Sequence, residues 1–355
     1  MQKIMHLGRL AFIGKKRSIP KKIDKILFFK IGALGDILMT TPLIRAIRRK
    51  FPNATIDYVC GKSFAKALEG NKNINFIIEF DEKTFFNNNL KELKKLQQKL
   101  KENKYDIVFV LDKHWAVAAF TSFIADFRIG FDRNGEGFAN NLNIKYNQNR
   151  HDIDAYLDMA LYFQAREKNT KMDLVITNKD KIFAKKICKK NAIAIAPGGG
   201  INTGQNALIK IWPKERYLEI IGRLSKNYNI ILVGDKNDKK ISSWITKHAK
   251  NKKKIKDMCG RATIKQTAAI MELCKFIVCN DSGAMHIASC VNDKIISIFG
   301  PTNPHVLAPL NKGSVFIWKE KKACYDIYGN FGKCKKGIME QISAEDVLNA
   351  TRKFF

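Results

Sequence analysis

KFIVCNDSGAMH (residues 275–286) and IISIFGPTNP (residues 295–304) form the stretch of sequence that decides the fold. Each piece opens with a short run of apolar residues and then breaks into a polar or glycine-containing turn. A helix-sized segment lies between the two apolar runs, so the pattern predicts a strand, a turn, a helix and a second strand. Such a βαβ unit belongs to a parallel sheet, and parallel sheets bind ligands at the carboxyl ends of their strands.

The turn after the first of these strands suits an anion. Asp281 and Ser282 lie just past the strand end, and Gly283 lets the backbone turn into the helix. The first N–H groups of that helix have no partner within it, and the helix dipole adds positive potential, so a phosphate is favoured there. Many α/β proteins contain such turns, so a purely structural role stays open for this turn taken alone.

Strands and helices also alternate in the first half of the chain. Apolar runs predict strands at residues 26–29, 55–60, 74–80 and 105–111, and a helix at 37–47 that Pro42 either kinks or restarts after Thr41. A lysine-rich segment at 90–100 carries leucines at helical spacing and predicts an amphipathic surface helix.

The second half repeats this alternation. It has predicted strands at 192–196 and 229–233 and a helix from Pro213, and capping boxes at Thr263 and Ser343 start two further helices. Glycine turns follow strands in both halves, which suggests an enzyme with its site in a cleft. We expect an α/β chain with two Rossmann-like, doubly wound sheets.

We divide the chain into four parts. A basic amphipathic N-terminal segment covers residues 1–24, and a first Rossmann-like domain covers 25–170. A second Rossmann-like domain covers 171–340, and a C-terminal helix follows at 341–355. The N-terminal segment lacks a cleavage site for a signal peptide, and both contact with an anionic membrane leaflet and an unstructured tail stay open for it.

The composition adds a strong basic bias. The 355 residues carry a formal net charge of +31, which fits nucleic acid, an anionic membrane surface or a phosphorylated substrate, although a lysine-rich composition throughout the chain would also produce it. Lysine outnumbers arginine and no nucleic-acid-binding motif is present, so we do not expect nucleic acid as a partner. No apolar run approaches the roughly 18 residues of a membrane span.

The eight cysteines do not form a metal-binding pattern. None of them stands in a Cys-x-x-Cys pair, so a zinc site is not expected, and several lie in apolar runs where a free thiol packs as a small hydrophobe. A reducing cytoplasm is the simplest setting. No Gly-x-Gly-x-x-Gly follows a strand and no Walker motif occurs, which disfavours NAD and P-loop chemistry and leaves a nucleotide-sugar transferase.

Five motifs, in order along the chain, carry a family resemblance. They are KIGALGD at 30–36 with TTP at 40–42, APGGG at 196–200, KIWP at 210–213, NDSGAMH at 280–286 and FGPTNP at 299–304. From about residue 25 to about residue 347 the chain resembles the ADP-heptose:lipopolysaccharide heptosyltransferases. The resemblance implies a GT-B fold, in which two Rossmann-like domains face a central cleft, and an inverting transfer of heptose from ADP-heptose to the lipopolysaccharide core.

The resemblance assigns roles in the first domain. Asp36 matches the general base that takes the proton of the acceptor hydroxyl, although an aspartate at this place also suits the N-cap of the following helix. Lys30, Gly35 and Arg45 are predicted to contact the acceptor, whose phosphates suit basic residues at 15–25 and 45–50.

The second domain is predicted to bind the donor. Lys210 matches the lysine that neutralises the leaving diphosphate, and it counts as catalytic here. The predicted donor-binding residues are Gly198, Gly199, Thr203, Asp238, Asp281, Ser282, Gly283, Ala284, His286 and Thr302. Asp235 is the alternative to Asp238 as the residue that binds the adenosine ribose. For His286 the alternative is a packed position in the core. No cofactor or metal is implied, because Lys210 and the helix terminus supply positive potential.

Two departures from the family pattern limit the resemblance. Asn303 stands where relatives often have aspartate, and Ile338 stands where they often have cysteine, so no metal or disulfide is expected for Cys324 and Cys334. A related GT-B transferase with another nucleotide sugar and a non-catalytic protein that binds anionic lipid or nucleic acid remain the alternatives. We expect a cytoplasmic enzyme, peripheral on the inner membrane, with ADP-heptose and a lipid A-core acceptor as its ligands.

Overall fold

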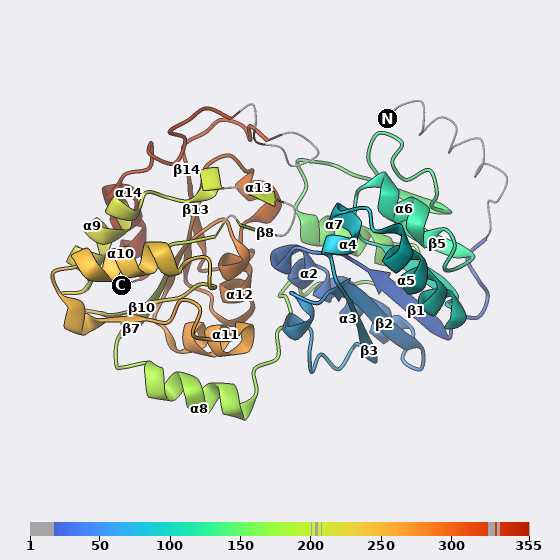
Figure 1. Ribbon diagram of the computed structural model, residues 1–355, viewed down its shortest axis with the longest axis horizontal. Coiled ribbons are helices and arrows are strands. Elements are labelled where there is room, and N and C mark those ends of the chain that lie inside the picture. Colours follow the sequence, from blue (N-terminus) through green and yellow to red (C-terminus); the bar gives the residue numbers. More distant parts are fainter. Residues whose placement is uncertain are drawn as a thin grey trace. The chain divides into compact units, whose positions relative to one another are not determined.

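The computed structural model describes residues 18–199, 201–202, 205–206, 208–325, 331 and 334–354. They form two compact units that divide between Thr170 and Lys171 (Figure 1). Each unit contains a six-stranded sheet, and all neighbouring strands of both sheets are parallel. The predicted α/β class with two Rossmann-like domains is therefore confirmed.

The first unit has the strand order β3-β2-β1-β4-β5-β6. Its strands are β1 (Lys25–Phe29), β2 (Thr55–Gly61), β3 (Phe76–Phe80), β4 (Ile107–Val110), β5 (Phe127–Asp132) and β6 (Leu142–Lys145). Its α-helices are α2 (Leu34–Met39), α3 (Thr41–Lys50), α4 (Lys83–Phe86), α5 (Leu90–Glu102), α6 (Trp115–Thr121) and α7 (Asp152–Leu161).

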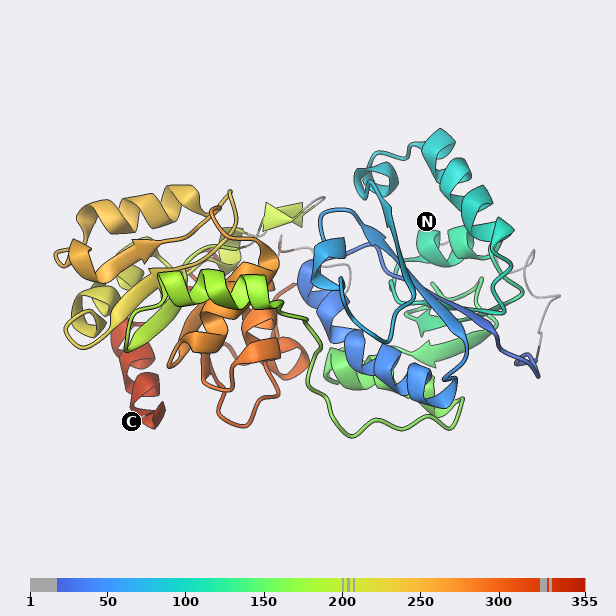
Figure 2. The same cartoon turned by 90° about the horizontal axis from the view of Figure 1, so that it is seen from below.

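Alternating side chains of β1 fill two cores. Leu27 and Phe29 pack with Val108 and Leu100 into a cluster on the side of α5 and α6. Phe28 points to the other face, where its ring stacks on that of Phe109 at 4.6 Å between centroids. Helices cover both faces of the sheet (Figure 2), so the side chains that β1 sends alternately to the two faces are buried, which explains the uninterrupted apolar run in the sequence.

The second unit has the strand order β11-β10-β7-β12-β13-β14. Its strands are β7 (Ala192–Ala196), β10 (Asn229–Leu232), β11 (Ile255–Asp257), β12 (Ile277–Asn280), β13 (Ile295–Phe299) and β14 (Val315–Trp318), and a small antiparallel pair joins β8 (Ile201–Asn202) to β9 (Gln205–Asn206). Its α-helices are α8 (Asn178–Ile187), α9 (Lys214–Leu224), α10 (Lys239–His248), α11 (Ile264–Leu273), α12 (Gly283–Val291), α13 (Pro304–Leu307) and α14 (Ala344–Thr351). The helices α9, α10 and α14 share one buried core over the sheet.

Local signals located most of these elements. The helix predicted around Pro42 ends at Met39 and restarts at Thr41, with the proline in the first turn where its missing N–H costs nothing. Thr263 and Ser343 form the predicted capping boxes. The strands β5, β6, β11 and β14 were not predicted, because they are short or lie at or next to a sheet edge with weak apolar patterns.

Each strand order reverses at one place. In the first sheet the chain leaves β1 towards β2 and β3, then returns to add β4 beside β1 on the other side. In the second sheet the same reversal puts β12 beside β7. Connections that run in opposite directions open a crevice at the carboxyl ends of such a strand pair, and ligands bind there. The residues after β1, β4, β7 and β12 are therefore the candidates for a binding site.

One expectation about the cysteines is wrong. Cys324 and Cys334 form a disulfide, with their Cα atoms 5.1 Å apart. The two cysteines are ten positions apart in the sequence, and no pattern in the sequence predicts that their sulfurs meet. The remaining cysteines are free, and all of these except Cys188 are buried.

Candidate functional site

Lys30 and Asp112 lie at the switch point of the first sheet, directly after β1 and just after β4. Lys30 is 5% exposed, and its Nζ lies 2.7 Å from Asp112 Oδ1 and 3.7 Å from Asp36 Oδ2. The other oxygen of Asp112 accepts the Ile31 N–H at 2.7 Å. Burial acts to lower the pKa of Lys30, but the nearby Asp112 and Asp36 outweigh it and raise that pKa. Lys30 is therefore a buried cation between two carboxylates.

Asp36 occupies the third position of α2. Its Oδ2 accepts the N–H of Ala33 at 3.2 Å, and Ala33 is the N-cap of the helix. The alternative role of Asp36 as the N-cap residue is therefore wrong, because the N-cap is Ala33, three residues earlier. About a third of the side chain, 36%, is exposed, so the carboxylate is accessible at the carboxyl edge of the sheet.

A second ion pair adjoins this group. Both oxygens of Asp152, the first residue of α7, lie 2.9 Å from Lys113 Nζ, and Tyr146 donates its hydroxyl to Asp152 at 3.1 Å. The ammonium of Lys113 also lies 4.0 Å from the centroid of the Tyr146 ring. Burial raises the pKa of Tyr146, and the charges of Asp152 and Asp36 raise it further, so its hydroxyl stays protonated.

Tyr156 lies deeper, one helical turn along α7. Its hydroxyl is buried and has no hydrogen-bond partner among the described residues. Burial raises the pKa of Tyr156, with further contributions from Asp36, Asp152 and Asp112. The hydroxyl is thus a buried polar group within the electrostatic range of these carboxylates, and a bound water would satisfy it.

Sequence reasoning missed the residues from β4 and α7. The run at 105–111 predicted a strand correctly, but Asp112 and Lys113, which follow it, were given no role. The rule that ligands bind at carboxyl ends would have selected these two residues. No comparable signal marks Tyr146, Asp152 or Tyr156, which reach the site only through the folding of β6 and α7.

The other predicted acceptor residues lie elsewhere in the first unit. Arg45 donates to Glu167 at 2.8 Å and to the Asn169 carbonyl at 2.5 Å, so its guanidinium ties α3 to the end of this unit. Gly35 is buried in α2, next to Asp36. Contact of either residue with an acceptor stays a prediction.

Lys210 and Asp281 form the charged centre of the second unit. Lys210 Nζ lies 2.7 Å from Asp281 Oδ2, and Thr302, after β13, donates its hydroxyl to the same carboxylate at 2.7 Å. Burial acts to raise the pKa of Asp281, but Lys210 and the hydrogen bonds from Lys210 and Thr302 outweigh it, so that pKa lies below its ordinary value. Three predicted residues from separate segments thus meet after β12.

The loop after β7 approaches both α12 and Asp238 very closely. A Cβ on Gly198 would lie 1.9 Å from Asp238 Oδ1, and one on Gly199 would lie 2.5 Å from Ser282 Cβ. Gly199 also has a φ of +107°, which L side chains rarely adopt. Both positions therefore require glycine, because the backbone must pass within contact distance of its neighbours.

Asp238 holds this loop in place. Its two oxygens accept the N–H groups of Gly199 at 2.8 Å and of Asp235 at 2.9 Å. Burial raises the pKa of Asp238, and these two N–H groups oppose the rise. Asp235 itself is exposed and accepts from Asn237. The carboxylate of Asp238 therefore already has backbone partners, whereas that of Asp235 lies at the surface.

Ser282 caps α12 without using its side chain. Its hydroxyl oxygen is buried and has no hydrogen-bond partner among the described residues, and it makes no side-chain cap on the helix. Gly283 and Ala284 form the first turn behind it, and both are half-buried. A hydroxyl and a helix N-terminus at the carboxyl edge of a parallel sheet are the donors that a phosphate oxygen needs.

Asn280 joins the segments of this site, and sequence reasoning gave it no role. Its side-chain oxygen accepts from the Trp212 N–H at 3.2 Å and the Tyr217 hydroxyl at 2.8 Å. Its amide nitrogen donates to the carbonyls of Pro197 at 3.2 Å and Gly198 at 2.9 Å. This buried side chain therefore fixes the glycine loop and the segment after Lys210 to the end of β12.

Two further predicted donor residues remain. His286 is buried on α12, and it contributes to the lowering of the pKa of Asp281. Thr203 lies outside the described residues. The roles of both in donor binding stay predictions.

The sequence matches the model of one protein family over most of its length. The model of glycosyltransferase family 9 (heptosyltransferase) matches residues 93–333, which is more than half of the sequence. The chain belongs to glycosyltransferase family 9. This confirms the predicted family and the predicted enzyme class. The lipooligosaccharide heptosyltransferase 2 of Haemophilus ducreyi is 27% identical over 322 residues, which cover 82% of this chain and 88% of that protein.

Solved structures share the fold of this family 9 glycosyltransferase. A glycosyltransferase of the same family from Veillonella parvula matches with a TM-score of 0.81 and 20% identity, over 95% of this chain and 99% of its own. The ADP-heptose lipopolysaccharide heptosyltransferase II of Escherichia coli matches with a TM-score of 0.74 and 21% identity, over 93% and 98%. These matches confirm the predicted GT-B fold class.

Proposed function

We propose that this enzyme transfers heptose from ADP-heptose to a hydroxyl of the lipopolysaccharide inner core, with inversion at the anomeric carbon. The observation that carries the proposal is the buried, unpartnered hydroxyl of Ser282 at the N-terminus of α12, close to the Lys210–Asp281 pair. These groups suit a diphosphate at the switch point of the second sheet. The donor named for the Escherichia coli relative, ADP-heptose, fits such a site.

In this proposal the donor unit stabilises the leaving group. As the bond between the anomeric carbon and the diphosphate oxygen breaks, negative charge grows on ADP. Lys210, the Ser282 hydroxyl and the first N–H groups of α12 are positioned to stabilise that charge. Asp281 keeps the ammonium in place between turnovers, and it gives up part of this contact as the diphosphate binds.

In the first unit Asp36 acts as the general base. The acceptor oxygen attacks the anomeric carbon from the face opposite the diphosphate, and the Asp36 carboxylate takes the hydroxyl proton. The cation of Lys30, 3.7 Å away, offsets the negative charge of the Asp36 carboxylate. A single displacement of this kind inverts the anomeric centre and needs no covalent enzyme intermediate.

We also propose that the enzyme acts at an anionic membrane surface, where a lipid-linked acceptor would lie. Helix α5 supports this: it carries exposed lysines and begins at Leu90, which is 67% exposed, and Phe86 at the end of the preceding helix α4 is 51% exposed. Cations next to exposed apolar side chains suit an anionic lipid leaflet. In the part of the chain that the structure describes, no helix is both long and apolar enough to cross a membrane.

The decisive test is calorimetric titration of the Asp36→Asn variant with ADP-heptose, with UDP- and GDP-sugars as controls. We expect selective binding near micromolar, about 8 kcal/mol, together with a loss of transfer of about a hundredfold or more. A Lys210→Met variant should lose most of the binding. Preference for a UDP- or GDP-sugar would show that the enzyme uses a donor other than ADP-heptose. The absence of any nucleotide-sugar binding would refute the proposal.

A further inference from the structure

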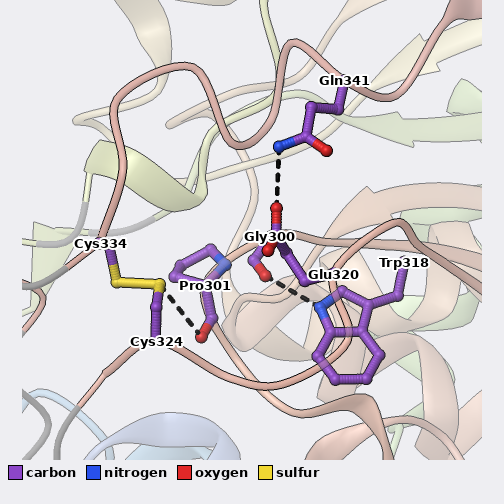
Figure 3. The surroundings of a disulfide bond; sticks show 7 residues. All are labelled: Gly300, Pro301, Trp318, Glu320, Cys324, Cys334 and Gln341. Carbon is purple, nitrogen blue, oxygen red and sulfur yellow. Dashed lines mark hydrogen bonds between the residues drawn. A yellow bond between two sulfur atoms is a disulfide. The ribbon is translucent and has the colours of Figure 1, made fainter.

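The disulfide between Cys324 and Cys334 lies against the turn that follows β13 (Figure 3). The N–H of Cys324 donates to the Pro301 carbonyl at 3.0 Å, and its sulfur lies 3.8 Å from the same oxygen. Trp318 Nε1, at the end of β14, donates to the Gly300 carbonyl at 2.9 Å. The end of β14 and the chain after it thus donate to two successive carbonyls of this turn.

The same turn reaches the donor lysine. Thr302 follows Pro301 directly, and its hydroxyl donates to Asp281, which in turn pairs with Lys210. Thr302 and Asp281 are both buried, so this connection is shielded from solvent. A shift of the turn after β13 would therefore move the carboxylate that holds the lysine.

Phe331 connects Cys334 to Lys210. It lies between the two cysteines in the sequence, and the Cys334 N–H donates to its carbonyl at 2.9 Å. The centroid of its ring lies 5.8 Å from Lys210 Nζ, within the range of a cation–π contact. The ring of Tyr325 pairs with it at 6.1 Å between centroids.

These contacts therefore form a closed chain of residues that includes Lys210. From the disulfide it runs through Pro301, Thr302, Asp281, Lys210 and Phe331 and returns to Cys334. Lys210 is held by a carboxylate that one end of the disulfide fixes and by an aromatic ring that the other end fixes. An ammonium on a flexible four-carbon stem gains the most from such fixing.

We propose that the Cys324–Cys334 disulfide and the Phe331 ring position Lys210 for the donor diphosphate, so that the affinity for the nucleotide depends on the redox state of this cystine. Phe331 and the two cysteines are positioning residues, because they act through Lys210. The inference rests on the proposed function, since it takes Lys210 as the residue that binds diphosphate. It goes beyond that function by making donor binding sensitive to thiols.

The redox step needs only a dithiol reductant. One thiolate of the dithiol attacks a sulfur of the cystine, and the second thiolate then closes a ring on the mixed disulfide. Two electrons and two protons pass from the dithiol to Cys324 and Cys334, which become thiols, while the dithiol becomes a cyclic disulfide. Both cysteines are half-buried, so the bond is within reach of a small reductant.

The test measures ADP binding by calorimetry, with adenosine as the phosphate-free comparison. For the wild-type protein, dithiothreitol should raise the Kd for ADP about threefold or more, while the Kd for adenosine stays the same. A thiol assay run in parallel must show two additional free thiols. The Cys324→Ser/Cys334→Ser variant should already have the weaker affinity and should not respond to the reductant.

Phe331 gives a test that leaves the disulfide intact. Phe331→Leu removes the π face and should weaken ADP binding about two- to fivefold, whereas Phe331→Tyr keeps the ring and should bind as the wild type does. In transfer assays the loss should appear mainly in KM for the donor rather than in kcat. A general packing defect would instead affect adenosine and ADP alike, which would overturn the proposal.

The outcomes separate this inference from the proposed function. If the oxidised wild-type protein binds no ADP, the proposed function fails. If it binds ADP and neither reduction nor Phe331→Leu changes the Kd, the donor assignment stands and the redox inference is wrong. A wild-type protein without a cystine in the thiol assay under oxidising conditions would also overturn it.

Discussion

The pair formed by Lys30 and Asp112 should set the pH at which Asp36 becomes active as a base. Replacing Lys30 with methionine removes the cation 3.7 Å from the Asp36 carboxylate. Replacing Asp112 with asparagine removes the competing carboxylate, which now lies 2.7 Å from the same ammonium. The two substitutions should therefore move the activity profile in opposite directions.

The distance gives the size of the effect. Two unit charges about 4 Å apart interact by about 4 kcal/mol at an effective dielectric constant of 20 and by about 1 kcal/mol in water. Because 36% of the Asp36 side chain is exposed, the interaction energy lies between these limits. At about 1.36 kcal/mol per pH unit, the activity profile should move by about 1–2 pH units.

The assay is kcat/KM for heptosyl transfer from about pH 4 to about pH 9, a range that brackets the ordinary titration of a carboxylate. For Lys30→Met the acidic limb should move up by about 1–2 pH units, because the carboxylate loses its stabilising cation. For Asp112→Asn the limb should move down, because Lys30 then interacts with Asp36 alone. Lys25→Met is the matched control, since Lys25 begins the same strand at its opposite end.

The charge of Asp36 acts on Tyr146, after β6, and on Tyr156, in α7, and Lys113 acts on Lys30; these three groups stay constant in this comparison. Thermal unfolding must accompany the kinetics, because breaking a buried ion pair costs about 3–5 kcal/mol. Movement of the limb in the same direction for both variants, or no movement in folded protein, would refute the role given to Lys30.

Three further predictions concern the second unit. Asn280→Ala removes four hydrogen bonds between buried groups and should lower the free energy of unfolding by about 2–4 kcal/mol in urea titrations; an unchanged midpoint would contradict its linking role. Gly199→Ala should lower the free energy of unfolding by about 1–3 kcal/mol and weaken ADP binding in calorimetry, since the φ of Gly199 is +107° and a Cβ there would meet Ser282. The control is Gly222→Ala, which should not destabilise the protein because a Cβ at Gly222 meets nothing within 4 Å. The pKa of Asp281 is lowered on folding, so its carboxylate stabilises the protein above the ordinary pKa of 3.8 and loses that effect as the pH falls through the folded value. The difference in the free energy of unfolding between wild type and Asp281→Asn, measured by urea denaturation, should therefore shrink below about pH 4. A difference that stays constant with pH would contradict the ion pair.

The sequence by itself determined the local structure and the identity of the chemistry-bearing residues. Buried parallel strands produce uninterrupted apolar runs, so β1, β7, β12 and β13 were visible, and capping boxes marked the helices at Thr263 and Ser343. The motifs around Asp36, Lys210 and Asp281 located the principal charges. These signals are local, because backbone period, helix caps and glycine turns involve residues a few positions apart.

Only the tertiary structure decided which of these residues meet. The reversal of strand order puts Asp112 beside Lys30, and α7 brings Asp152 and Tyr156 to the same group, although more than eighty residues separate Lys30 from Asp112. The disulfide was not predicted for the same reason: whether Cys324 and Cys334 meet is decided by the tertiary structure and not by their spacing in the sequence. Such contacts depend on the summed path of the backbone, which no short window of sequence contains.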